Sequence, residues 1–155
     1  MRVIEDRAGP VNRRRRRRCE YDVEVELAVR DYECDLQGVV NHAVYLHYLE
    51  HARHLFLRRA GIDFVRLHEQ GCDLVLTRAE VDYIAPLRPG DAFVVCTSLE
   101  PDRPSRFAFE QAIFRLPDEE RVVRARMVGT GVIGGRAGLP PELEARLTRA
   151  AGAAP

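Results

Sequence analysis

The chain has 155 residues, 46% of them hydrophobic, and its formal net charge is zero. This length fits one domain that buries about two thirds of its unfolded surface, and the composition excludes a chain that is disordered throughout. The charge is unevenly distributed, however. Residues 1–18 hold eight arginines against two acidic residues, a net of +6, which leaves −6 for residues 19–155. A mildly acidic folded part argues against a nucleic-acid groove within the fold.

The positive charge is concentrated in six consecutive arginines that run from Arg13 to Arg18. Because like charges repel one another and cannot be buried together, we expect residues 1–20 to form a disordered tail and residues 21–150 to form the folded domain. The arginine run could contact nucleic acid or another acidic surface, or it could be a functionless extension. Nothing in the acidic remainder favours nucleic acid as a partner.

No stretch approaches the ~18 apolar residues that a membrane helix needs, and the charged N-terminus has no apolar segment typical of a signal peptide. The four cysteines, at positions 19, 34, 72 and 96, include no CxxC pair. This spacing favours neither a zinc site nor a disulfide framework, so we expect free, buried thiols in a reducing compartment. The sequence thus predicts a cytoplasmic protein without membrane contact.

The first predicted strand begins at Tyr21, where apolar side chains start to alternate with acidic ones as far as Val29. This alternation is typical of a strand with one face in water. A tight turn follows, since Asp35 and Gly38 occupy the first and last positions of a type I turn.

The turn leads into a predicted helix over residues 43–59, where apolar residues recur at a spacing of three or four. Gly61 follows as a plausible C-terminal cap, and a shorter helix is expected from Phe64 to Glu69. The predicted polar face of the long helix holds His47, Glu50, His51, Arg53, His54 and Arg58. Its three histidines suggest a metal site, but no carboxylate or cysteine completes a set at ligand spacing. We therefore expect a solvated or interface surface there and no metal.

The rest of the chain alternates with a period of two, which predicts strands at residues 74–84, 92–99, from 107 to a turn at 116–118, and 123–133. A short helix at residues 140–147 follows. We expect the last four strands to form consecutive antiparallel hairpins. One long helix must then serve the whole sheet, which predicts an α+β fold with about five antiparallel strands wrapped around it. The edges of such a sheet need a partner.

The segment between Asp35 and His42 carries the strongest functional signal. It places a carboxylate one tight turn before the start of a helix, where backbone N–H groups are unpaired and the helix dipole is positive. Acyl-transfer chemistry requires a general base or nucleophile that faces such an oxyanion site. The segment therefore predicts an enzyme that hydrolyses an activated acyl group.

Three sequence motifs lie along the predicted elements. They are Asp35-Leu36-Gln37-Gly38-Val39-Val40, then His42-Ala43-x-Tyr45-Leu46 with Glu50 and Arg53, and Tyr83-x-Ala85-Pro86-Leu87-Arg88-x-Gly90-Asp91. Together they resemble the hot-dog-fold thioesterases of the 4-hydroxybenzoyl-CoA thioesterase type, over roughly residues 21–133. Many members have Tyr at the position of Asn41. The Asn41 form looks more like a branch of acyl-ACP and acyl-CoA thioesterases with plant plastid and bacterial members.

The resemblance implies that Asp35 is the catalytic carboxylate and that the backbone N–H of His42 polarises the thioester carbonyl. It also implies an acyl-CoA or acyl-ACP substrate, no cofactor, and an active site between the subunits of a homodimer or homotetramer. Five further residues are expected at the substrate. They are Gly38, Val40, Tyr45, Glu50 and Arg88.

Several alternatives stay open at the level of the sequence. Asp35 could serve only the turn, Asn41 could cap the helix or hold the attacking water, and Glu50 could pair on the helix surface or lie at a dimer interface. As a catalyst, Asp35 could act as a general base or attack the carbonyl to form an anhydride. The fold could also be a non-catalytic acyl-binding or sensing module, or a hydratase or dehydratase with His42 as the base.

Overall fold

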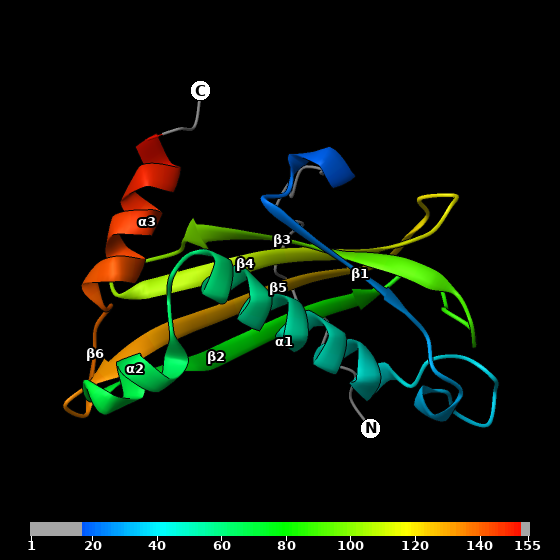
Figure 1. Cartoon of the computed structure of the whole chain (residues 1–155), viewed down its shortest axis with the longest axis horizontal. Helices are drawn as coiled ribbons and strands as arrows, with labels where there is room; N and C mark the ends of the chain where they lie inside the picture. Colours follow the sequence, from blue (N-terminus) through cyan, green and yellow to red (C-terminus); the bar gives the residue numbers. More distant parts are fainter. Residues whose placement is uncertain (1–16, 153–155) are drawn as a thin grey trace, which may run out of the picture.

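A computed structural model describes residues 17–152 (Figure 1). These residues form two 3₁₀ turns, three α-helices and six strands. They are η1 (Arg18–Glu20), β1 (Val23–Ala28), η2 (Asp31–Glu33), α1 (His42–Arg59), α2 (Phe64–Glu69), β2 (Cys72–Tyr83), β3 (Ala92–Pro101), β4 (Arg106–Arg115), β5 (Arg121–Ile133), β6 (Arg136–Ala137) and α3 (Pro141–Gly152).

The strands form one antiparallel sheet in the order β1-β3-β4-β5-β2, and the two-residue β6 pairs with the end of β5. Helix α1 lies across one face of this sheet (Figure 1). The side chains that α1 buries there are mostly aromatic or aliphatic, and they pack with the inner faces of the strands in one core. The predicted α+β class, with five long strands around one helix, is confirmed.

The predicted run of four hairpins is wrong at its first step. Strand β2 pairs with β5, Tyr83 opposite Val123, and β3 pairs with β1 as well as β4. Alternating apolar residues tell which face of a strand is buried but not which strand lies beside it. Residues 84–91 connect β2 to β3, so the chain crosses from an edge of the sheet to its interior, and β2 is left as an edge strand.

Both ends of α1 match the sequence prediction. Asn41 is the N-cap residue, and Gly61 follows the helix with a φ of +77°, a conformation that glycine adopts without steric cost. The predicted polar face is wrong in one position, because the side chain of Arg53 is only 8% exposed. It is buried because its guanidinium donates a hydrogen bond to Gln111 on β4.

The residues just before β1 are ordered against the outer face of the sheet. The guanidinium of Arg18 donates to Glu24 at 2.8 Å and to Glu119 at 3.0 Å, and the ring of Tyr21 meets that of Phe114 edge to face. Arg18 is therefore held against the sheet, at the end of the arginine run for which the sequence predicts disorder. Residues 1–16 of the predicted tail lie outside the described residues.

The C-terminal helix α3 is longer than the predicted residues 140–147, and it buries Leu143 and Leu147. All four cysteines are free, and Cys72 and Cys96 are buried as predicted, whereas Cys19 is exposed and Cys34 is half-buried. Burial raises the pKa of the Cys96 thiol to about 12, so it stays protonated. No helix within residues 17–152 is long and apolar enough to span a membrane.

Strand β5 is pressed closely against its neighbours at Gly129. A Cβ atom there would lie 2.5 Å from the ring of Phe107 and 2.8 Å from the backbone oxygen of Val75. We expect Gly129→Ala to lower the free energy of unfolding by about 1–3 kcal/mol, because this overpacking forces strands apart. Gly138→Ala is the control, since its Cβ would meet only Ile133, at 3.5 Å. Equal denaturation midpoints for the two variants would contradict the close packing.

Candidate active site

The turn that carries Asp35 is closed by its own backbone. The N–H of Asp35 donates to the Val39 oxygen at 2.9 Å, the N–H of Gly38 donates to the Asp35 oxygen at 3.0 Å, and Cys34 bridges to Val40. Gly38 has a φ of +72°, which explains why glycine stands there. The predicted Asp-Gly turn is confirmed, and it fixes the backbone of Asp35 at the tip of a closed loop.

The carboxylate of Asp35 is half-buried and oriented by Gln37. Its Oδ1 accepts a hydrogen bond from the backbone N–H of Gln37 at 2.9 Å. The Gln37 side-chain amide also points back, and its nitrogen, turned toward the carboxylate, lies 2.9 Å from both oxygens. The sequence analysis missed Gln37, although an Asp two residues earlier is the usual sign of such a turn. The carboxylate is thus held in place while its outer lone pairs stay accessible.

The first turn of α1 leaves one backbone donor for a ligand. The Asn41 side chain accepts from the N–H of Ala43 at 2.9 Å, and the Asn41 backbone oxygen accepts from the N–H of Val44 at 2.9 Å. The N–H of His42 has no acceptor within residues 17–152. The capping role of Asn41 is therefore observed, and the N–H of His42 is an available donor at the positive end of the helix.

Asp35 and His42 open into the same cleft, which has a volume of about 340 Å³. Its other walls come from the loop before α1, from α1 itself and from the end of β2 and the residues after it. They are Val39, Val40, Tyr45, Tyr83, Ile84, Ala85 and Pro86. The structure thus brings together four of the predicted residues, with Gly38 in the turn beside them. Tyr83 was not predicted at the site, and its hydroxyl donates to the His42 backbone oxygen at 2.9 Å.

The third sequence motif holds the loop and the helix together through Leu87. The N–H of Val40 donates to the Leu87 oxygen at 2.9 Å, and the N–H of Leu87 donates to the Tyr45 hydroxyl at 3.0 Å. Burial raises the pKa of Tyr45, so this hydroxyl stays neutral. Tyr45 lines the cleft with its ring, while its hydroxyl oxygen serves the backbone.

A buried carboxylate behind the loop supports the site and was missed by the sequence analysis. Glu33 is 8% exposed and accepts hydrogen bonds from the Tyr48 hydroxyl at 2.6 Å, the Arg30 N–H at 2.7 Å and the Arg30 guanidinium at 3.0 Å. Burial opposes its ionisation, but these hydrogen bonds lower the pKa of Glu33. The same residue's backbone oxygen accepts from Asn41 at 3.0 Å. In the sequence, the buried position of Glu33 is indicated only by Arg30, an opposite charge three residues earlier.

Two predicted substrate residues lie away from this cleft. Arg88 is exposed, and its backbone N–H donates to Asp91 in the turn before β3. Glu50 lines a separate cavity of about 310 Å³ between α1 and β2, beside Arg53 and His54. Within one chain, neither residue is part of the Asp35 cleft.

The predicted histidine surface divides in two. His47 and His51 line a hollow beside Arg30 and Glu33, whereas the His54 ring packs on Phe64 with centroids 5.0 Å apart. Within residues 17–152, no three His, Cys, Asp or Glu side chains are grouped as metal ligands would be.

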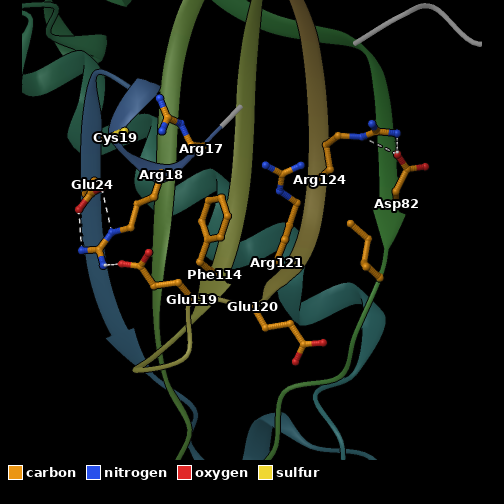
Figure 2. Close-up of a pocket in the computed structure, with 11 residues that line it drawn as sticks. Arg17, Arg18, Cys19, Glu24, Asp82, Phe114, Glu119, Glu120, Arg121 and Arg124 are labelled. Atoms are coloured by element: carbon orange, nitrogen blue, oxygen red, sulfur yellow. Dashed lines mark hydrogen bonds and ion pairs between the residues drawn. The ribbon is translucent and has the colours of Figure 1, made fainter. Parts of the chain in front are cut away.

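A hollow of about 1050 Å³ lies on the opposite side of the sheet from α1 (Figure 2). Several of its charged side chains form ion pairs there, as Arg18 does with Glu24 and Glu119 and Arg124 does with Asp82. None of its lining residues belongs to an α-helix, whereas the Asp35 cleft is lined by the first residue of α1.

Comparison with known proteins identifies the family of the chain. The family model described as the thioesterase-like superfamily matches residues 29–149. A chloroplastic acyl-acyl carrier protein thioesterase of Arabidopsis thaliana, ATL2, is 43% identical over 109 residues, which are 70% of this chain and 57% of that protein. The chain thus spans little more than half the length of this plant relative.

Solved structures share the fold. A thioesterase of Thermus thermophilus, complexed with coenzyme A and Zn, is 30% identical with a TM-score of 0.70, over 82% of this chain and 98% of that one. Slr0204, a 1,4-dihydroxy-2-naphthoyl-CoA thioesterase from Synechocystis, is 21% identical with a TM-score of 0.75, over 81% of this chain and 94% of that one. The hot-dog architecture is therefore common to this chain and these proteins.

The hydrogen bond between Tyr48 and Glu33 gives a test of the support behind the loop. Tyr48→Phe removes the donor and leaves a buried carboxylate short of one partner, so we expect a loss of about 1.5–3 kcal/mol in the free energy of unfolding. Tyr32→Phe is the matched control, because Tyr32 is 82% exposed. Denaturant unfolding compares them, and a loss no larger in Tyr48→Phe than in the control would contradict the role of Glu33.

Proposed function

Because the chain belongs to the thioesterase-like superfamily, we propose that it hydrolyses an acyl-CoA or acyl-ACP thioester to a free acid and a thiol. One observation carries the proposal. A carboxylate fixed by its own turn and an available backbone donor at the start of α1 line the same cleft. The relatives' names supply the two thiol carriers, coenzyme A and acyl carrier protein.

The reaction uses few groups. Asp35 removes a proton from a water molecule that attacks the thioester carbonyl, or its carboxylate attacks that carbon directly and the resulting anhydride is then hydrolysed. In both routes the carbonyl oxygen becomes an oxyanion, which the His42 N–H and the positive end of α1 stabilise. The C–S bond then breaks and the thiol leaves. Neither route needs a metal or an organic cofactor.

The remaining residues of the cleft position the substrate. Val40 and the ring of Tyr45 supply apolar surface, and Tyr83 holds the His42 carbonyl so that the first turn of α1 cannot shift. The Asn41 side-chain oxygen is occupied by the cap, so Asn41 can hold a water only through its amide nitrogen. Glu33 and Tyr48 act from behind, as positioning residues.

A second copy of the chain is proposed to complete the site. Strand β2 is an edge of the sheet. Four apolar side chains, three on β2 and one directly after it, are 40–55% exposed. They are Val75, Leu76, Tyr83 and Ile84. An exposed apolar edge favours pairing with another strand, and two identical edges related by a twofold axis pair antiparallel. We propose a homodimer joined along β2, with a homotetramer as the larger alternative.

Two expectations from the sequence stay predictions. One is contact between the arginine run and an acidic surface, since most of that run lies outside residues 17–152. The other is a cytoplasmic location.

Asp35→Asn tests the proposed chemistry. The amide keeps the volume and can still accept from the Gln37 N–H, but it can neither take a proton nor attack, so we expect kcat for a good acyl-CoA to fall by about 10² to 10⁴. Thiol release reports the rate. Asp31→Asn, a change of the same type at an exposed position of η2, is the control and should stay near wild type. Turnover of Asp35→Asn within a few-fold of wild type would contradict the proposed role of Asp35 as base or nucleophile.

Leu76→Arg tests the proposed dimer. It places a charge on the exposed apolar edge, so we expect sedimentation at the mass of a monomer and loss of thioester hydrolysis, because the cleft stays open to water. Val65→Arg, on α2, is the control, since Val65 is 67% exposed and lies outside β2. Full activity of a species with monomer mass would overturn the shared site.

A further inference from the structure

The guanidinium of Arg53 is buried and forms no ion pair within residues 17–152, although Glu50 lines the same cavity. It is 8% exposed, and its one hydrogen bond to the rest of the described chain joins Nη1 to the side-chain oxygen of Gln111 at 2.9 Å. No carboxylate of residues 17–152 forms an ion pair with it. A charge removed from water is costly unless it is paired, so an arginine that keeps a neutral partner here requires an explanation.

Gln111 is held so that only its oxygen is left for Arg53. The amide nitrogen of Gln111 donates to the Leu49 backbone oxygen at 3.0 Å and to the Thr97 hydroxyl at 3.0 Å. Gln111 is fully buried. Its orientation is therefore fixed by α1 and β3, and it fixes one edge of the guanidinium in turn. Arg53 is a preoriented group and not a solvent-seeking surface side chain.

The rest of the guanidinium faces a cavity. An arginine has five N–H donors, of which Gln111 takes one, and no nitrogen of Arg53 is sealed off without a partner. The cavity of about 310 Å³ is otherwise mainly apolar, with walls from α1, α2, β2 and β4. Besides Arg53, its polar lining residues are Glu50 and His54, and its apolar ones are Leu57, Phe64, Leu74, Val75, Leu76, Phe107 and Phe109. Burial lowers the pKa of Arg53, while the charge of Glu50 opposes that shift.

We propose that this cavity binds the far end of the acyl group and that Arg53 selects acyl chains with an oxygen acceptor there. The shared chemistry is an oxygen that accepts from the guanidinium, whether in a carboxylate, a ketone or a hydroxyl group. This inference rests on the proposed thioesterase function. An apolar chain fits the walls, and an oxygen at its end accepts from one or two of the four donors that Gln111 leaves free.

The proposed dimer explains how one substrate reaches both places. His42 and Arg53 are eleven residues apart on α1, about 16 Å along the helix axis. The cleft lies at the Tyr83 end of β2 and the cavity at its Leu74 end. When two β2 edges pair antiparallel, the Tyr83 end of one copy approaches the Leu74 end of the other. The acyl chain would then run from the Asp35 cleft of one copy into the Arg53 cavity of its partner.

The test measures kcat/KM of the full-length protein with CoA thioesters of equal chain length whose far end is a methyl, hydroxyl, ketone or carboxylate group. At the chain length that reaches the cavity, we expect kcat/KM of at least one thioester with an oxygen at its far end to exceed that of the thioester with a methyl end by about 10- to 100-fold. Preference for the thioester with a methyl end at every chain length would overturn the proposal. Hydrolysis of none of these esters would instead reject the thioesterase function itself.

Arg53→Met assigns the preference to this side chain. Methionine replaces the aliphatic part of the arginine side chain but has no donor, so we expect the preference to disappear while the thioester with a methyl end is still hydrolysed. Arg58→Met, at an exposed position of the same helix, is the control and should keep it. A preference that persists in Arg53→Met would overturn the assignment. If Arg53→Met does not fold, inhibition of wild type by free dicarboxylates and monocarboxylates of equal length decides, since equal inhibition by both would contradict a site for a second oxygen.

Discussion

The proposed chemistry needs the Asp35 carboxylate and the N-terminus of α1 to be held in one cleft, and the hydrogen bond between Tyr48 and Glu33 connects the loop of Asp35 to that helix. Tyr48 lies in the second turn of α1, and Glu33 lies two residues before Asp35. Asn41, at the other end of the loop, donates its N–H to the Glu33 oxygen. One residue thus ties the loop to α1 through its side chain and closes the loop through its backbone. Because the carboxylate is buried, losing a donor costs more than an exposed hydrogen bond would.

The same helix is fixed from its other side by polar contacts in the core. Gln111 accepts from Arg53 and donates to the Leu49 backbone and to Thr97, so α1, β3 and β4 meet in one buried network. Apolar packing alone would allow a helix to rotate or slide in a curved sheet, whereas a network with few satisfied arrangements specifies one position. These contacts fix the position of α1, and with it the position of His42 at the start of the helix.

Local features of this chain could be predicted because their causes are local. The Asp35–Gly38 turn, the Asn41 cap and the glycine after α1 each follow from the conformations of a few adjacent residues. The pairing of β2 with β5 and the burial of Arg53 could not be predicted, because each is decided by a partner far away in the sequence. Arg53 is polar by residue type, and only Gln111, 58 positions later, makes its burial possible. The burial of Glu33 likewise depends on a distant partner, Tyr48, in addition to Arg30 nearby.

The unfinished part of the site follows from the sheet order. Since β2 is an edge strand, the cleft at its Tyr83 end and the cavity at its Leu74 end are both open along the same side of one chain. The middle of β2 is exposed, because α1 packs over the more central strands. One added surface can therefore cover the strand, close both openings and exclude water from the oxyanion position. In the proposed dimer, the second copy thus contributes to the proposed chemistry as directly as Asp35 does.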